Sequence, residues 1–200
     1  EAAEPTSYFV QSDEGVGQEL WATDGTPDGT RLVRDIWPGL EAGVQQSDRQ
    51  VWGDLFFFVG DDGVAGPEVW RTDGTSAGTF PLSSLPFAPG YDAQVGFGAL
   101  PGAALFLSYA VDGRVTLWRS DGSVAGTTPI WSVDFPDFQE IYPLSAIGDR
   151  VMFAFPQSWS LEIWQSDGTP SGTTQVAVLP VSTGGWFWGG GSAPKLSPFR

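Results

Sequence analysis

The pattern that decides the fold occurs four times: ELWATDGTPDGT (19–30), EVWRTDGTSAGT (68–79), TLWRSDGSVAGT (116–127) and EIWQSDGTPSGT (162–173). Each copy holds a tryptophan, a Thr or Ser, an Asp-Gly pair, and a second Gly followed by Thr. The tryptophans, Trp21, Trp70, Trp118 and Trp164, are separated by 49, 48 and 46 residues. A period of this length indicates one supersecondary unit that is copied and stacked along the chain.

Short apolar segments surround each copy at nearly constant positions. An aromatic segment lies upstream, at 7–10, 55–60, 104–109 and 151–155, and a second segment lies downstream, at 30–36, 79–85, 127–133 and 173–179. A further apolar patch precedes three of the aromatic segments, at 50–53, 94–100 and 139–145. Short apolar runs between Gly and Pro are typical of strands rather than helices. Four strands in about 48 residues predict an all-β chain folded as a four-bladed β-propeller, with four antiparallel strands in each blade.

The phase of the repeat predicts how the ring closes. The offset from the second Gly-Thr to the next aromatic segment is 27, 27 and 26 residues, and the same offset of 26 from Thr173 reaches Phe199. We therefore expect one domain over 1–200, with units at about 1–43, 44–89, 90–136 and 137–183. Residues 184–200 are expected to supply the missing strand of the first blade. Such closure removes free edge strands, which otherwise invite aggregation.

Composition argues against several classes of function. The 200 residues are 41% hydrophobic and carry nine Lys and Arg against 24 Asp and Glu, a net charge of −15. This charge repels nucleic acid, and the longest apolar run, 51–60, is too short for a membrane-spanning helix of about 20 residues. The absence of His and Cys removes the commonest general base, the thiol nucleophile, disulfides and Cys-based zinc sites. We therefore expect no enzyme, no binding to nucleic acid and no membrane insertion.

Each repeated residue has a structural interpretation. Asp hydrogen-bonds the backbone that follows it and Gly tolerates positive φ, so the Asp-Gly pair suits a tight turn. We expect this role for Asp24, Asp73, Asp121 and Asp167. Calcium binding is the alternative, but calcium takes about six to eight oxygen ligands and each loop offers one carboxylate. The four repeat tryptophans are expected to pack between neighbouring blades.

Residues outside the repeat are the candidates for binding. Trp52, Trp159, Trp186 and Trp188 occupy no repeated position, so they are candidates to contact a sugar or a protein partner. Gln46, Gln94 and Gln139 lie 24, 24 and 25 residues before their tryptophans, a spacing that could place their amides along a central channel. These amides either hydrate the channel or bind an axial ion, calcium or sodium. No cofactor is required.

The units ELWATDGTPDGTRLVRDI and EVWRTDGTSAGT resemble the ELWxxDGT repeats of bacterial secreted and surface proteins. The resemblance covers all four copies, and the third departs from it with TLW in place of ELW and with Ser123. It implies an extracellular or cell-envelope propeller and supplies no catalytic residue. Four-bladed closure also resembles the hemopexin fold, by architecture only, which implies a narrow axial channel able to hold an ion.

These observations lead us to expect a non-catalytic extracellular or cell-surface module with an interaction or structural role. Its partner is a protein, a glycan or a second copy of the chain. The alternative is a carbohydrate-binding, lectin-like propeller that uses the tryptophans outside the repeat. A carboxylate-based glycosidase is the third interpretation; such an enzyme needs two carboxylates about 5–9.5 Å apart, and no motif selects a pair.

Overall fold

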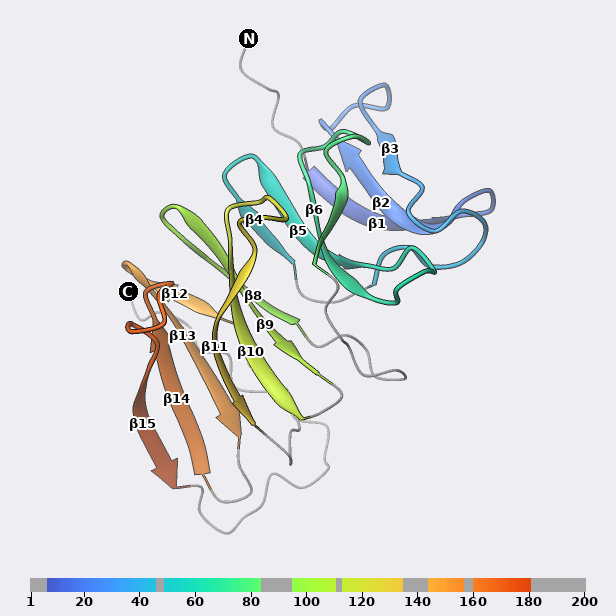
Figure 1. Ribbon diagram of the computed structural model, residues 1–200. Coiled ribbons are helices and arrows are strands. Elements are labelled where there is room, and N and C mark those ends of the chain that lie inside the picture. The colour runs from blue at the N-terminus through green and yellow to red at the C-terminus, as the bar shows by residue number, and fades with distance from the viewer. Residues whose placement is uncertain are drawn as a thin grey trace. The chain divides into compact units, whose positions relative to one another are not determined.

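The fold was analysed in a computed structural model, which describes residues 7–45, 49–83, 95–110, 113–134, 144–156 and 160–180. These residues form fifteen β-strands and no helix (Figure 1). None of the described segments is a helix long and apolar enough to cross a membrane. The chain divides into two compact units, Glu1–Ala93 and Gln94–Arg200. Each unit contains two antiparallel sheets.

The first unit holds a three-stranded sheet and a four-stranded sheet. The first sheet has the order β1-β2-β3 and the second has the order β4-β5-β6-β7. The strands of the first sheet are β1 (Ser7–Asp13), β2 (Gly17–Thr23) and β3 (Arg31–Arg34). Those of the second are β4 (Gln50–Trp52), β5 (Leu55–Gly60), β6 (Glu68–Thr72) and β7 (Phe80–Ser83).

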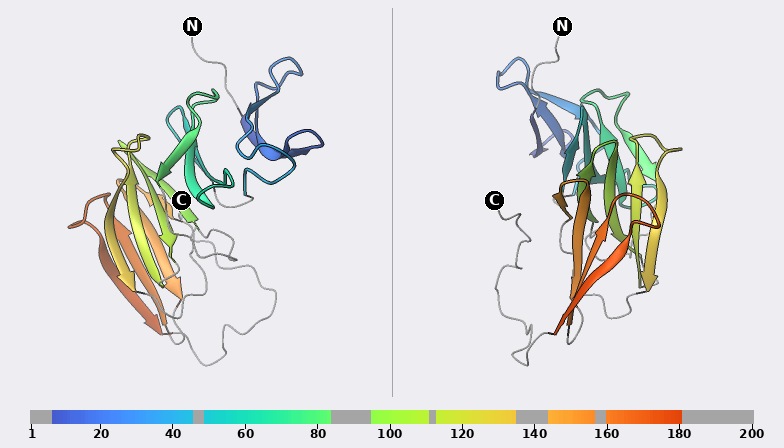
Figure 2. Two further views of the ribbon diagram at one scale, coloured as in Figure 1. Left: turned by 45° about the vertical axis from the view of Figure 1, so that its right-hand side comes forward. Right: turned by 90° about the vertical axis from the view of Figure 1, so that its left-hand side faces the viewer.

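The second unit holds two four-stranded sheets (Figure 2). The third sheet consists of β8 (Val95–Leu100), β9 (Ala103–Tyr109), β10 (Arg114–Ser120) and β11 (Thr128–Asp134). The fourth consists of β12 (Ser145–Ile147), β13 (Arg150–Pro156), β14 (Ser160–Ser166) and β15 (Thr174–Pro180). Strand order follows chain order in both sheets, as it does in the first unit.

The register shows that the four sheets are copies of one unit. The repeat tryptophan always pairs with a phenylalanine of the preceding strand: Phe9 with Trp21, Phe58 with Trp70, Phe106 with Trp118, and Phe153 with Trp164. On its other side, each tryptophan strand has a β-bulge in its pairing with the following strand, placed directly before the tryptophan. The expectation of an all-β chain built from repeated antiparallel sheets is therefore confirmed.

The expected fourth strand of the first sheet, at 184–200, lies outside the described residues. So does most of the apolar patch expected at 139–145; the described inner strand of the fourth sheet, β12, begins at Ser145. The other expected strands agree with the observed ones to within a few residues at each end.

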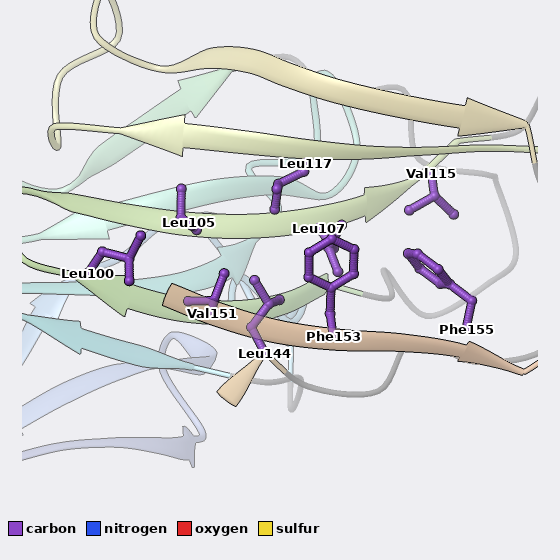
Figure 3. Packing of buried hydrophobic residues seen from close by; sticks show 9 residues of the cluster. All are labelled: Leu100, Leu105, Leu107, Val115, Leu117, Leu144, Val151, Phe153 and Phe155. Carbon is purple, nitrogen blue, oxygen red and sulfur yellow. The ribbon is translucent and has the colours of Figure 1, made fainter. Parts of the chain in front are cut away.

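Each unit has its own hydrophobic core between its two sheets. In the first unit, Leu20 and Val33 of the first sheet join Phe56, Phe58 and Trp70 of the second in one buried cluster. In the second unit, leucines of β8, β9 and β10 face Val151, Phe153 and Phe155 of β13 (Figure 3). Successive side chains of a strand point to opposite faces of the sheet, so one face of each sheet supplies residues to the core. Strands β5 and β9 are buried at nearly every position.

Candidate functional site

The four Asp-Gly turns share one hydrogen-bond pattern. In the second copy, Asp73 Oδ1 accepts hydrogen bonds from the Thr75 backbone N–H at 2.9 Å and from Thr75 Oγ1 at 2.7 Å. Thr75 Oγ1 in turn accepts the Gly78 N–H at 2.9 Å. The other copies repeat these bonds, with Ser123 replacing Thr in the third. The hydroxyl bond to each aspartate is the main cause that lowers the pKa of that carboxyl below its usual value.

The second glycine of the motif is explained by lack of space. A Cβ atom added at Gly78 would lie 2.1 Å from the Asp73 carboxylate oxygens, and the equivalent glycines of the other copies are equally tight. The glycine after each aspartate has a different reason, because its φ lies between +83° and +93° in all four copies. Both glycines of the motif are therefore required by the turn itself.

A pair of hydroxyl groups closes each turn onto its strand. Thr72 Oγ1 lies 2.7 Å from Thr79 Oγ1 and accepts the Gly74 N–H at 2.9 Å. Ser120 pairs with Thr127 and Ser166 with Thr173 in the same way, both buried, whereas the Thr23–Thr30 pair of the first copy is exposed. The Thr or Ser before each Asp-Gly pair thus has a structural role.

No metal cluster emerges at these turns. Among the described residues, no group of three or more acidic, His or Cys side chains could hold a metal ion. Each turn aspartate directs Oδ1 at its own loop, as a turn-forming residue would. The channel candidates Gln46, Gln94 and Gln139 all lie outside the described residues.

The repeat tryptophans line the faces of the sheets. Trp70 is buried with 1% exposure, while Trp21, Trp118 and Trp164 are partly buried. The Trp118 indole N–H donates to Ser108 Oγ at 2.9 Å, and that of Trp164 donates to Glu162 Oε2 at 3.2 Å. Their positions on the sheet faces are those of packing residues.

Of the four tryptophans expected to bind a ligand, one lies in the described part of the chain. Trp52 ends β4, is partly exposed, and lies with its ring 6.3 Å from that of Phe57. Trp159, Trp186 and Trp188 fall outside the described residues. Trp131, another tryptophan outside the repeat, packs in the second unit with its ring 4.7 Å from that of Trp164.

Sequence reasoning missed one unusual carboxylate, that of Glu19. Its side chain is fully buried, and burial raises the pKa of its carboxyl to about 7. Glu19 Oε1 accepts the Trp37 N–H at 3.1 Å, while Oε2 is buried without a partner. Glu19 is the first letter of the repeat, so a pattern search treats it like Glu68 and Glu162 and does not reveal its different surroundings.

Comparison with known proteins supports the fold and leaves the family open. No known family model matches the chain, and no curated protein matches it. Among solved structures, the chain is similar to a puromycin hydrolase, with a TM-score of 0.57 and 16% identity over 89% of this chain and 28% of the other. It is also similar to a prolyl endopeptidase, with a TM-score of 0.53 and 14% identity over 88% and 27%.

A third similarity, to an α-L-arabinofuranosidase from Clostridium thermocellum, has a TM-score of 0.42 and 14% identity over 82% of this chain and 61% of the other. The chain spans less than a third of the length of the first two proteins. Their shared feature is the fold: this chain is structurally similar to β-propeller domains. At such identities the likeness carries no activity.

Proposed function

We propose that the chain is a non-catalytic interaction or structural module of the bacterial surface or extracellular space, folded as a closed four-bladed β-propeller. The observation that carries this proposal is the use of the repeated polar groups. The turn aspartates, hydroxyl groups and second glycines all contact their own turns. Residues outside the repeat are then the candidates for contact with a binding partner.

Exposure at equivalent positions supports ring closure. The repeat phenylalanines Phe58, Phe106 and Phe153 have 0% exposure, whereas Phe9 of the first sheet is partly exposed. In the strand that follows each tryptophan strand, the β-bulge contains one extra residue. This residue is Val33, Leu82 and Ile130 in the first three sheets and Val176 in the fourth. Val33 and Leu82 are buried and Ile130 is partly buried, but Val176 is 52% exposed.

The first and last sheets thus each have one apolar face that is less covered than its internal counterparts. Ile163 follows the same trend: it is partly exposed, while Leu20, Val69 and Leu117 have 0% exposure. In the proposed ring, the Phe9 face and the Val176 face cover each other, which removes exposed apolar area worth about 25 cal/mol per Å².

A carbohydrate-binding propeller is the second candidate. The observation in its favour is Trp52, which lies outside the repeat and remains partly exposed at the end of β4. Aromatic side chains at a surface present a flat apolar face, which suits stacking on a sugar ring. A single aromatic platform does not define a site, so this candidate ranks below the first.

The two candidates are separated by binding measurements on the purified chain. A glycan array, followed by tryptophan fluorescence titration with any positive glycan, tests the carbohydrate proposal, with Trp52→Ala as the variant. Sedimentation velocity tests self-association, and a labelled chain added to intact producing cells tests surface binding. The first proposal expects surface binding or self-association without glycan binding. Turnover of glycosides by the purified chain would contradict both candidates.

A further inference from the structure

The segment 35–44, here called the connector, follows the first sheet and is held against strand β2. The Gln18 N–H donates to Glu41 O at 3.3 Å, and Gln18 O accepts the Gly43 N–H at 3.0 Å. The approach is close, because a Cβ at Gly17 would lie 2.1 Å from Glu41 O. The connector also reaches the second sheet, since the Asp61 N–H donates to Gly43 O at 2.9 Å. It therefore joins the two sheets of the first unit.

The Glu19 side chain is hydrogen-bonded to the backbone in the middle of this connector. Its Oε1 atom accepts the Trp37 N–H at 3.1 Å. A Cβ at Gly43 would lie 2.1 Å from Oε1, so glycine is needed there for the close approach. The Trp37 N–H and the close approach of Gly43 together orient the carboxyl group.

The other oxygen of Glu19 is left without a donor. Glu19 Oε2 and Asp35 Oδ1 are both buried and unpartnered among the described residues. The negative charge of Asp35 acts on Glu19 and adds to the rise in its pKa. A buried carboxylate oxygen without a donor is costly, and a charge of the same sign in the surroundings adds to the cost. A proton on Glu19 Oε2 removes the buried charge and with it this repulsion.

In the described part of the chain, no basic side chain forms an ion pair with Glu19. The charged groups on the elements around Glu19 are Asp13 at the end of β1, Arg31 and Arg34 in β3, Asp35 and Glu41 in the connector, and Asp61 after β5. Arg31 donates to Gly74 O at 3.1 Å. Arg34 is engaged elsewhere: it donates to Thr79 O and lies over the Trp70 ring at 5.7 Å. The ion pairs found in the described ranges involve neither Glu19 nor Asp35.

We propose that Glu19 is protonated in the folded chain, and that this protonated side chain is a pH-sensitive clasp that holds the connector on β2. The clasp is tightest in mild acid. Because the carboxyl pKa is raised in the folded state, its stabilisation is complete below the ordinary value of 4.5 and is lost as the pH rises to about 7. The clasp therefore loosens toward neutrality.

Hydrogen exchange at the connector amides tests the clasp. One group with these two pKa values changes the opening constant roughly 40-fold between about pH 5 and about pH 7. Protection factors of the Ile36, Trp37 and Gly43 amides, corrected for the intrinsic effect of pH, should fall by that factor. In Glu19→Gln the amide side chain donates as the protonated acid does, so the fall should shrink to less than about twofold.

Two further variants make the test decisive. Asp35→Asn removes the neighbouring charge, which raises the Glu19 pKa less than burial does, so it should reduce the pH dependence without abolishing it. Glu14→Gln removes an exposed carboxylate from the β1–β2 turn and should retain the full dependence. Protection that does not change with pH in the unmodified chain would overturn the proposal. So would a pH dependence that survives Glu19→Gln.

Discussion

The buried Thr72–Thr79 hydroxyl pair of the second turn leads to a prediction about stability, and the exposed Thr23–Thr30 pair of the first turn provides the control. Thr79 Oγ1 donates its only proton to Thr75 O at 2.6 Å. The proton between Thr72 and Thr79 must therefore come from Thr72, whose oxygen also accepts the Gly74 N–H. Thr72→Val keeps the shape of the side chain but removes both functions of the hydroxyl group. The change leaves the buried Gly74 N–H without its partner.

The expected cost follows from these two lost bonds. An unsatisfied buried N–H costs about 1–3 kcal/mol, and the lost hydroxyl bond contributes about 0.5–1.5 kcal/mol. We expect Thr72→Val to lower the free energy of unfolding by about 1.5–4.5 kcal/mol. Thr23→Val makes the same change in the first turn, where the pair is exposed and water replaces the lost bonds. It should cost less than about 1 kcal/mol.

Urea unfolding followed by tryptophan fluorescence and by circular dichroism measures both variants. The midpoint should fall clearly for Thr72→Val and little for Thr23→Val, with unchanged slopes. Equal losses in the two variants would refute the reasoning, because burial would then not decide the value of the hydroxyl pair. A Thr72→Val variant as stable as the original chain would refute the assigned hydrogen bonds.

Two other predictions concern packing and acid. Trp131→Ala should lower the free energy of unfolding by about 3–5 kcal/mol, because its ring packs on Phe153, Phe155 and Trp164, whereas Trp52→Ala should cost less; thermal unfolding compares them. The turn aspartates have lowered pKa values, so their stabilisation is present above about pH 4 and is lost as the pH falls further. Replacing all four by Asn should weaken the acid dependence of the urea midpoint below about pH 4.

The repeat made the sheets predictable because each strand and turn recurs in step with a tryptophan. Strand β5 matches its expected range of 55–60, and the bulge before each tryptophan recurs in all four sheets. The spacing of the motif also placed its turn residues. Local sequence decides these features, since turn chemistry and alternation act over a few residues.

Features that depend on contacts outside the repeat were not predictable. Trp131 has no repeated position, yet its ring packs on Phe153 and Phe155 of β13 and on Trp164 of β14. Glu19 looked like the other glutamates of the motif, and its burial depends on the course of the connector, which the repeat does not specify. All four candidate binding tryptophans stay predictions, and only Trp52 lies within the described residues.

Ring closure is the central claim, and the cysteine-free chain allows a direct test. Tyr8 stacks on Phe56 at 4.7 Å between the first and second sheets. By the strand register, Met152 of the fourth sheet is equivalent to Tyr8 of the first sheet. Ser7 of the first sheet is likewise equivalent to Phe56 of the second sheet. In the proposed ring Ser7 and Met152 face each other across the roughly 10 Å between packed sheets. A thiol-specific crosslinker of that span should therefore join Ser7→Cys to Met152→Cys within one chain. Ser12→Cys with Met152→Cys is the control and should not be joined. A Ser7→Cys, Met152→Cys chain that is not crosslinked, or that is linked only to a second chain, would contradict the closed ring.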